Sequence, residues 1–153
     1  MPHDFRPDGI DDLILGSLSA DARRSFASIG LEVGLSTAAV KRRVDRLRRA
    51  GVITGFTVLI DQKRLGRPIE ALVELHTDGV LGVDRLRRAL GPIAEIVEAV
   101  TVTGDADTIV RLVAADTDRL EAAVQALRAI PSVRKTETNI VLSHLISRSS
   151  TAF

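Results

Sequence analysis

Residues 34–51, GLSTAAVKRRVDRLRRAG, concentrate positive charge in one short stretch. Between Ser36 and Ala50 a single aspartate stands against six cations, Lys41, Arg42, Arg43, Arg46, Arg48 and Arg49. This segment carries a net charge of +5 and the whole chain only +1, so the other 138 residues sum to −4. Because guanidinium and ammonium groups bind phosphate oxygens, the stretch is either a surface for nucleic acid or a solvated helix face.

The spacing of apolar residues in this stretch predicts an amphipathic helix. At about 100° per residue, Val40, Val44 and Leu47 fall on one narrow stripe, which predicts the buried side. The opposite side carries Ala38, Arg42 and Arg49. Small residues near the N-terminal end would let such a helix approach base edges in a major groove.

The residues upstream complete a helix-turn-helix pattern. SFASIGLEV predicts a shorter helix capped by Ser25, and Gly30 is small enough for two helices to cross closely. In the turn GLS, Gly34 suits a left-handed conformation and Ser36 can cap the next helix. Together these features favour double-stranded DNA as the partner of the basic helix.

Position along the helix predicts a role for each side chain. The leading turns would reach bases or phosphates through Ser36, Thr37, Ala38, Lys41 and Arg42. Arg46 and Arg49 lie further along and are predicted to contact phosphates. For Arg43 an internal salt bridge and a DNA contact are equally plausible, while Arg48 is expected to pair with Asp45 or to be solvated.

The remaining pattern divides the chain into two domains and a linker. A first helix is predicted from Asp8, with Ile10, Leu13, Ile14 and Leu18 on its apolar side. VITGFTVLI, residues 52–60, predicts a strand or short hairpin that ends an N-terminal domain of residues 1–60. The polar segment 61–68 predicts a hinge. Residues 1–7 and 147–153 are expected to fray.

Residues 69–153 predict a second domain with the order βαββαβ. The strands are expected at 69–77, 95–103, 107–115 and 133–146, and the helices at 83–90 and 117–130. This order is the ferredoxin-like arrangement, an antiparallel sheet with both helices on one face. The chain is therefore expected to be α+β, with a helix-turn-helix domain followed by a ferredoxin-like domain.

Composition argues against several functions. The chain has no cysteine, tryptophan or tyrosine and four phenylalanines, which disfavours thiolate metal sites and binding of single strands by base stacking. No signal-peptide pattern and no membrane-length apolar run are present, so a cytoplasmic protein with no membrane partner is expected. His3, His76 and His144 have no nucleophile motif near them, so no catalytic residue, metal or cofactor is predicted. Asp105 and Asp107 alone would be a thin Mg²⁺ site.

The ordered set of motifs resembles the Lrp/AsnC family, the feast/famine transcription regulators. The N-terminal half, IDDLILGSLSADARRSFASIGLEVGLSTAAVKRRVDRLRRAGVITGFTVLID, is similar to the family in order and spacing. VTGDADTIVRLVAAD and IPSVRKTETNIVLS resemble the two signature segments of its ligand-sensing domain. The resemblance covers residues 8–146 and implies a winged-type helix-turn-helix joined to a βαββαβ regulatory domain.

The resemblance also implies dimers, often assembled into octamers, that bind DNA and respond to an amino acid between regulatory domains. The implied effector residues are Val102, Gly104, Asp105 and Asp107 in one loop, and Thr136 and Thr138 on the last strand. Ala106 departs from the family, which usually has an aromatic residue or histidine there. The alternatives are a simple hairpin turn at GDAD, a metabolite sensor that binds no DNA, and a nucleoid-organising protein that wraps DNA with weak sequence preference and no effector.

Overall fold

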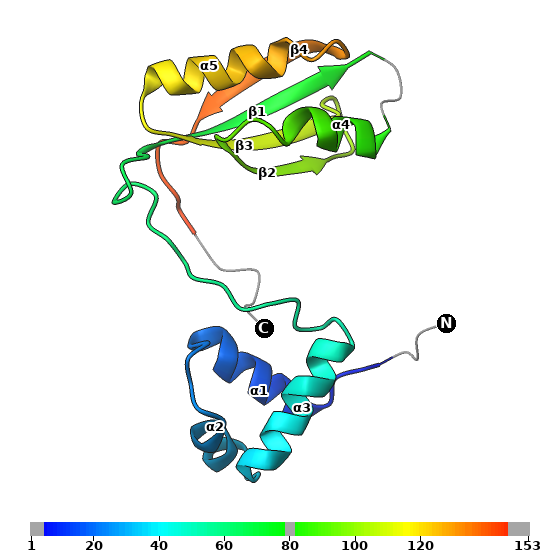
Figure 1. The fold of residues 1–153 in the computed structure, drawn as a ribbon, viewed down its shortest axis with the longest axis vertical. Coiled ribbons are helices and arrows are strands. Elements are labelled where there is room, and N and C mark those ends of the chain that lie inside the picture. The colour runs from blue at the N-terminus through cyan, green and yellow to red at the C-terminus, as the bar shows by residue number, and fades with distance from the viewer. Residues whose placement is uncertain (1–4, 79–81, 147–153) are drawn as a thin grey trace. The chain divides into compact units, whose positions relative to one another are not determined.

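A computed structural model describes residues 5–78 and 82–146 (Figure 1). The chain forms two compact units, one of residues 1–59 with residues from 146 onward, the other of residues 60–145. Most of the chain ends predicted to fray, residues 1–7 and 147–153, lie outside the described ranges, as does His3.

The first unit contains three helices, α1 (Gly9–Ala20), α2 (Phe26–Val33) and α3 (Thr37–Arg49). Ser25 and Ser36 cap α2 and α3 as predicted, because their hydroxyls accept hydrogen bonds from the backbone N–H groups of Ser28 and Ala39. Gly34 ends α2 in the left-handed conformation, with φ of 69°. These local signals set where α3 begins.

The core of the first unit confirms the predicted apolar stripe of α3. Val40, Val44 and Leu47 are buried. They lie with buried residues of α1 and α2, including Ile14, Leu18 and Ile29. Leu13, predicted on the buried side of α1, is instead 58% exposed, and Leu15 is buried in its place. The apolar side of α1 is therefore rotated toward Leu15 and Leu18.

The strand or hairpin predicted for residues 52–60 is wrong. No strand is present there, and Phe56, Val58 and Leu59 are extended in solvent. Only the first turn of the segment is anchored, because the N–H groups of Val52 and Ile53 both donate to the carbonyl of Leu47. The composition favours a strand, but within the described residues the segment has no neighbouring strand with which to exchange hydrogen bonds.

The second unit is the predicted antiparallel sheet with two helices. Its elements are β1 (Ile69–Thr77), α4 (Val83–Leu90), β2 (Ile96–Thr101), β3 (Thr108–Ala114), α5 (Thr117–Arg128) and β4 (Val133–Ile140). The strand order is β2-β3-β1-β4 (Figure 1), and each adjacent pair is antiparallel. β4 ends at Ile140, short of the predicted 146, because the last backbone bond to β1 is from Val141 to Glu70.

One face of this sheet forms the core with both helices. Ala71, Val73 and Leu75 alternate along β1 and are fully buried. They pack with Leu86 and Leu90 of α4, Val110 and Leu112 of β3, and Leu120, Val124 and Leu127 of α5. The residues that alternate with them, Glu70, Leu72, Glu74 and His76, therefore lie on the face away from the helices.

We predict that Gly30→Ala destabilises the first unit. Gly30 is buried, and an added Cβ would collide with the carbonyl oxygen of Leu35, in the turn that leads into α3. Overpacking of this kind costs about 1–3 kcal/mol. The measurement is the free energy of unfolding from urea titrations followed by helical circular dichroism.

Gly16→Ala is the matched control for this prediction. Gly16 is also helical, but a Cβ there would meet nothing within 4 Å. This variant should match the parent or exceed it by about 0.5–1 kcal/mol. Equal unfolding free energies for the two variants would contradict the close approach of α2 to the turn.

Candidate DNA-reading helix and ligand loop

The carboxylate of Asp11, on the first turn of α1, is fully buried and joins α1 to α3. Arg43 Nη1 donates to its Oδ1 at 2.9 Å, and Arg46 Nη2 donates to its Oδ2 at 2.7 Å. The same carboxylate accepts from the backbone N–H of Asp8, and Asp8 caps Asp11 in return. A buried carboxylate needs such partners, and here they fix the position of α3 against α1.

Two of the six cations of the basic stretch therefore face into the domain. Arg43 forms the internal salt bridge that was one of its two predicted roles, with Asp8 at 2.7 Å as well as Asp11. Arg46, predicted to contact phosphates, points its guanidinium at Asp11 and over the ring of Phe5, 5.0 Å from its centroid, and its side chain is still 44% exposed. Its partner lies 35 residues away, so helix position alone could not reveal the pairing.

The other predicted DNA-contacting residues of α3 lie on its exposed side. Ser36, Thr37, Ala38, Lys41, Arg42 and Arg49 are all exposed. Lys41 pairs with Asp45 at 3.1 Å, and Arg49 Nε donates to the carbonyl of Asp45 at 3.3 Å. Among the described residues, Arg42 and Arg48 have no such partner. Exposed pairs like that of Lys41 are weak and exchange easily for a phosphate.

Hydrogen bonds from Arg43 and from the backbone N–H of Asp11 lower the pKa of Asp8 below its ordinary value of 3.8. The same interaction raises the pKa of Arg43, so both groups stay charged. The Arg43–Asp8 ion pair is therefore complete across the whole neutral range.

In the second unit, the loop 102–107 joins β2 to β3 and is fastened to the end of β1. The carboxylate of Asp107 accepts from the N–H of Thr77 at 2.7 Å and from its hydroxyl at 3.0 Å. These bonds lower the pKa of Asp107. The N–H of Asp107 donates to Leu75, and the N–H of Val102 donates to the carbonyl of Asp107. Asp107 thus holds the loop in place.

The other acid of the loop, Asp105, lies two residues before Asp107 and has a different environment. Its side chain is 98% exposed, and its backbone carbonyl lies 3.2 Å from Nδ1 of the buried His76. Gly104 before it has φ of 137°, a conformation that L side chains rarely adopt. The loop geometry therefore presents one carboxylate to solvent.

The two threonines predicted for the effector site lie on β4. Thr136 faces Leu75 across the strands, and its hydroxyl accepts from Arg128 Nε at 2.9 Å. Thr138 faces Val73, two residues further from the loop. Ala106, at the departure from the family pattern, is buried beneath the loop.

His76 and Glu137 are residues near the loop that no motif indicated. His76 Nε2 is buried without a hydrogen-bond partner in the described chain, 3.8 Å from Glu137 Oε1. Lys135 forms an ion pair with Glu137 and lowers its pKa. The register of β1 and β4 places His76 opposite Lys135, and neither this pairing nor the contact with the loop could be predicted from the sequence.

Comparison with known proteins identifies both units. Residues 8–48 match the AsnC-type helix-turn-helix domain, and residues 70–151 match the Lrp/AsnC ligand binding domain. The chain is 46% identical over 143 residues to the HTH-type transcriptional regulator Rv2324 of Mycobacterium tuberculosis, covering 94% of this chain and 97% of that protein. The chain belongs to the Lrp/AsnC family of transcriptional regulators.

Solved structures of the Lrp/AsnC family share this fold. The structure of Escherichia coli AsnC has a TM-score of 0.88 at 25% identity, covering 97% of this chain and all of that one. The regulator NMB0573 of Neisseria meningitidis, solved as a complex with L-methionine, has the same TM-score at 18% identity, with 96% of each chain covered. The first-unit helices and the four-stranded sheet are thus those of the family.

Membership of the Lrp/AsnC family assigns the chain to a non-enzymatic class of DNA-binding transcriptional regulators. Within residues 5–78 and 82–146, no helix has both the length and the apolar character that crossing a membrane requires. The functional residues are accordingly sought on α3 and on the loop 102–107.

We predict that Arg43→Met lowers stability at neutral pH and flattens its loss in acid. Because the pKa of folded Asp8 lies below 3.8, the stabilisation is present above that pH and is lost as the pH falls through the lowered pKa. Without Arg43 this contribution shrinks. The measurement is the urea midpoint of the helical signal between about pH 6 and pH 2.5.

Arg48→Met removes the same charge from the same helix and serves as the control. It should keep the acid dependence of the parent. The pKa of Asp107 and of Glu137 is also lowered, so some loss in acid remains in every variant. An Arg43→Met curve parallel to that of the parent would show that the pair contributes nothing to stability.

Proposed function

We propose that this regulator binds specific DNA sequences through α3, and that an amino acid or related small metabolite bound at the loop 102–107 modulates this binding. The observation that carries the proposal is the division of cations on α3. Arg43 and Arg46 tie the helix to the domain. Lys41, Arg42 and Arg49 remain on the exposed side with the small residues of the first turn.

The first turn of α3 is the part best suited to base contacts. Thr37 and Ala38 are exposed and short, so the helix end can enter a major groove closely. Arg42, one turn later and without an ion-pair partner in the described chain, can reach a guanine edge or a phosphate. Arg49 and Lys41 supply further charge at the flanks.

Binding as a dimer is part of the proposal. A dimer would place two reading helices in successive major grooves, roughly 34–36 Å apart. The extended segment 52–60 exposes Phe56, Val58 and Leu59, whose pattern favours a strand. Pairing with the same segment of a second copy would supply the missing neighbour and cover these side chains.

The loop 102–107 carries groups that can bind both charges of an amino acid. The exposed carboxylate of Asp105 can pair with an ammonium group, and backbone N–H groups near Gly104 can bind a carboxylate. The match to a ligand-binding domain supports this assignment. A structure of the same fold, the Neisseria regulator, contains L-methionine.

We predict that Arg42→Ala weakens binding to the gene's own upstream region. If the side chain reads a base, the loss is about 1–3 kcal/mol at that region and much smaller on random DNA. A phosphate contact would weaken both and reduce the salt dependence. Gel-shift titrations at two salt concentrations measure this. Arg48→Ala, which removes an equal charge from the end of α3, is the matched control.

Equal affinity of the parent protein for the upstream region and for random DNA would contradict a specific regulator. It would instead support the nucleoid-organising alternative. Equal losses for Arg42→Ala and Arg48→Ala on both DNAs would show that only total charge matters.

We predict that at least one of the twenty amino acids raises the melting temperature and that Asp105→Ala abolishes the shift. A ligand at about 100 times its Kd stabilises by about 2.7 kcal/mol, which raises the Tm of a small domain by roughly 10 °C or more. Asp118→Ala, an exposed acid on α5, is the control and should keep the response. No shift with any amino acid would leave the loop as a simple turn.

A further inference from the structure

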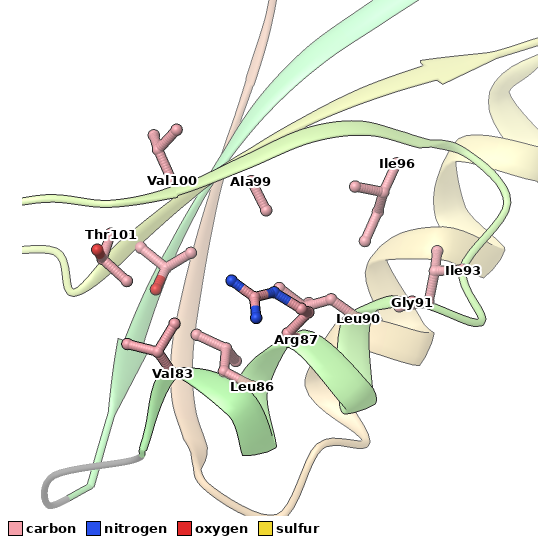
Figure 2. A pocket seen from close by; sticks show the side chains of 11 residues that line it. Val83, Leu86, Arg87, Leu90, Gly91, Ile93, Ile96, Ala99, Val100 and Thr101 are labelled. Carbon is pink, nitrogen blue, oxygen red and sulfur yellow. The ribbon is translucent and has the colours of Figure 1, made fainter. Parts of the chain in front are cut away.

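A cavity of about 550 Å³ opens between α4 and the edge strand β2, away from the loop residues considered so far (Figure 2). Its lining is mainly aliphatic, with Leu86 and Leu90 of α4 forming a buried floor and Ile93 and Ile96 closing one end. Its volume is within the range of small-molecule sites.

The cavity exists because the two helices pack differently on the sheet. α5 approaches β3 and β4 closely along its length, whereas α4 has few close approaches to any strand. On β2, Ala99 faces this side of the sheet but is small and remains exposed. A larger residue there would fill the space between β2 and α4.

Three polar groups line the aliphatic cavity. Thr108 is only 2% exposed, and its buried hydroxyl has no hydrogen-bond partner in the described chain. By strand alternation it lies on the same face as Val110 and Leu112, toward the cavity. A buried hydroxyl left unpaired costs free energy that a ligand could recover.

The other two polar groups are Thr101 and Arg87. Thr101 pairs with Thr108 across β2 and β3. Figure 2 shows Arg87 reaching from α4 across the cavity toward β2, with Ala99 and Thr101 on the opposite wall. Among the residues that the structure describes, its guanidinium bonds only to Asp84, at 3.1 Å, in a pair that is about three-quarters exposed on both sides. Such a pair leaves donors available for a ligand.

Within residues 5–78 and 82–146, no acidic side chain lines the cavity. A ligand ammonium would therefore lack a counter-charge, whereas a carboxylate would meet Arg87 and the threonine hydroxyls. We propose that the pocket between α4 and β2 binds a small aliphatic monocarboxylate, with its carboxylate on Arg87, Thr101 and Thr108 and its hydrocarbon on Leu86 and Leu90. This ligand class differs from the zwitterion proposed for the loop.

The pocket adjoins the loop without sharing its residues. Thr101 and Thr108 form the last pair of the β2–β3 ladder, directly before and after residues 102–107. A ligand bonded to both hydroxyls would brace the base of this hairpin. Binding of a carboxylate to this pocket does not require the amino-acid site, because it is measured at the pocket methyl groups in the absence of DNA and of any amino-acid effector.

The test uses the full chain with methyl-labelled leucine and isoleucine, followed by NMR. The probe is 4-methylpentanoate, compared with the uncharged 4-methylpentanamide and with leucine, which adds an ammonium to the same skeleton. We expect saturable shifts at the pocket methyls of Leu86, Leu90 and Ile96 with the carboxylate. The amide and leucine should bind at least about tenfold more weakly, as expected when a charge-assisted contact is lost or a charge is left unpaired.

Substitutions then assign the contacts. Thr108→Val keeps the shape and removes only the unpaired hydroxyl, so it should fold normally and weaken the carboxylate several-fold. Arg87→Met should weaken it at least about tenfold. Arg88→Met, a neighbouring exposed arginine that does not line the cavity, should have no effect.

Three results would overturn the proposal. The first is that no saturable shift occurs up to about 10 mM carboxylate, which is well above the Kd of a millimolar ligand. The second is that the amide binds as tightly as the carboxylate. The third is that Arg87→Met and Arg88→Met weaken binding equally. The Asp105→Ala variant separates this site from the proposed effector loop. It should bind the carboxylate as the parent does, even where it loses its response to amino acids.

Discussion

The buried carboxylate of Asp11 is the interaction on which the reading helix depends. It is fully buried, and it binds Arg43 and Arg46 of α3 while closing the capping box of α1. Removing one partner from a buried ion pair leaves an uncompensated charge, so this arrangement holds the two helices in a single orientation. The basic stretch therefore stabilises the domain at one edge and presents its remaining cations at another.

This division explains how a helix with six cations can pack on an apolar core. Val40, Val44 and Leu47 bury one stripe, and the two arginines beside that stripe find acids on α1. The cations on the far side are paired only weakly or not at all within the described chain. A recognition helix needs this combination, because its backbone must be rigid while its outward side chains stay available for phosphates and bases.

The features predictable from sequence are those fixed by local chemistry. The caps at Ser25 and Ser36, the left-handed Gly34 and the ranges of β1 and α4 depend on neighbouring residues, and each was predicted correctly. The pairing of Arg46 with Asp11 could not be predicted, because the two residues lie 35 positions apart in the sequence. The phosphate contact of Arg46 stays a prediction. The segment 52–60 has the composition of a strand, but composition cannot supply a neighbouring strand. The pocket under α4 was not predictable, because it depends on how far that helix stands from the sheet.

The β2–β3 hairpin links the two candidate ligand sites of the second unit. Its tip is the loop with the exposed carboxylate of Asp105, and its base is the Thr101–Thr108 pair, which lines the pocket between α4 and β2. Occupants of two sites influence each other only if the element between them has more than one arrangement whose balance each occupant shifts. The bonds from Thr77 to Asp107 clamp the tip to β1, and the backbone ladder joins the base to β3. A movement of the loop away from β1 would break the bonds between Thr77 and Asp107, so this clamp is a contact through which the two sites can be coupled.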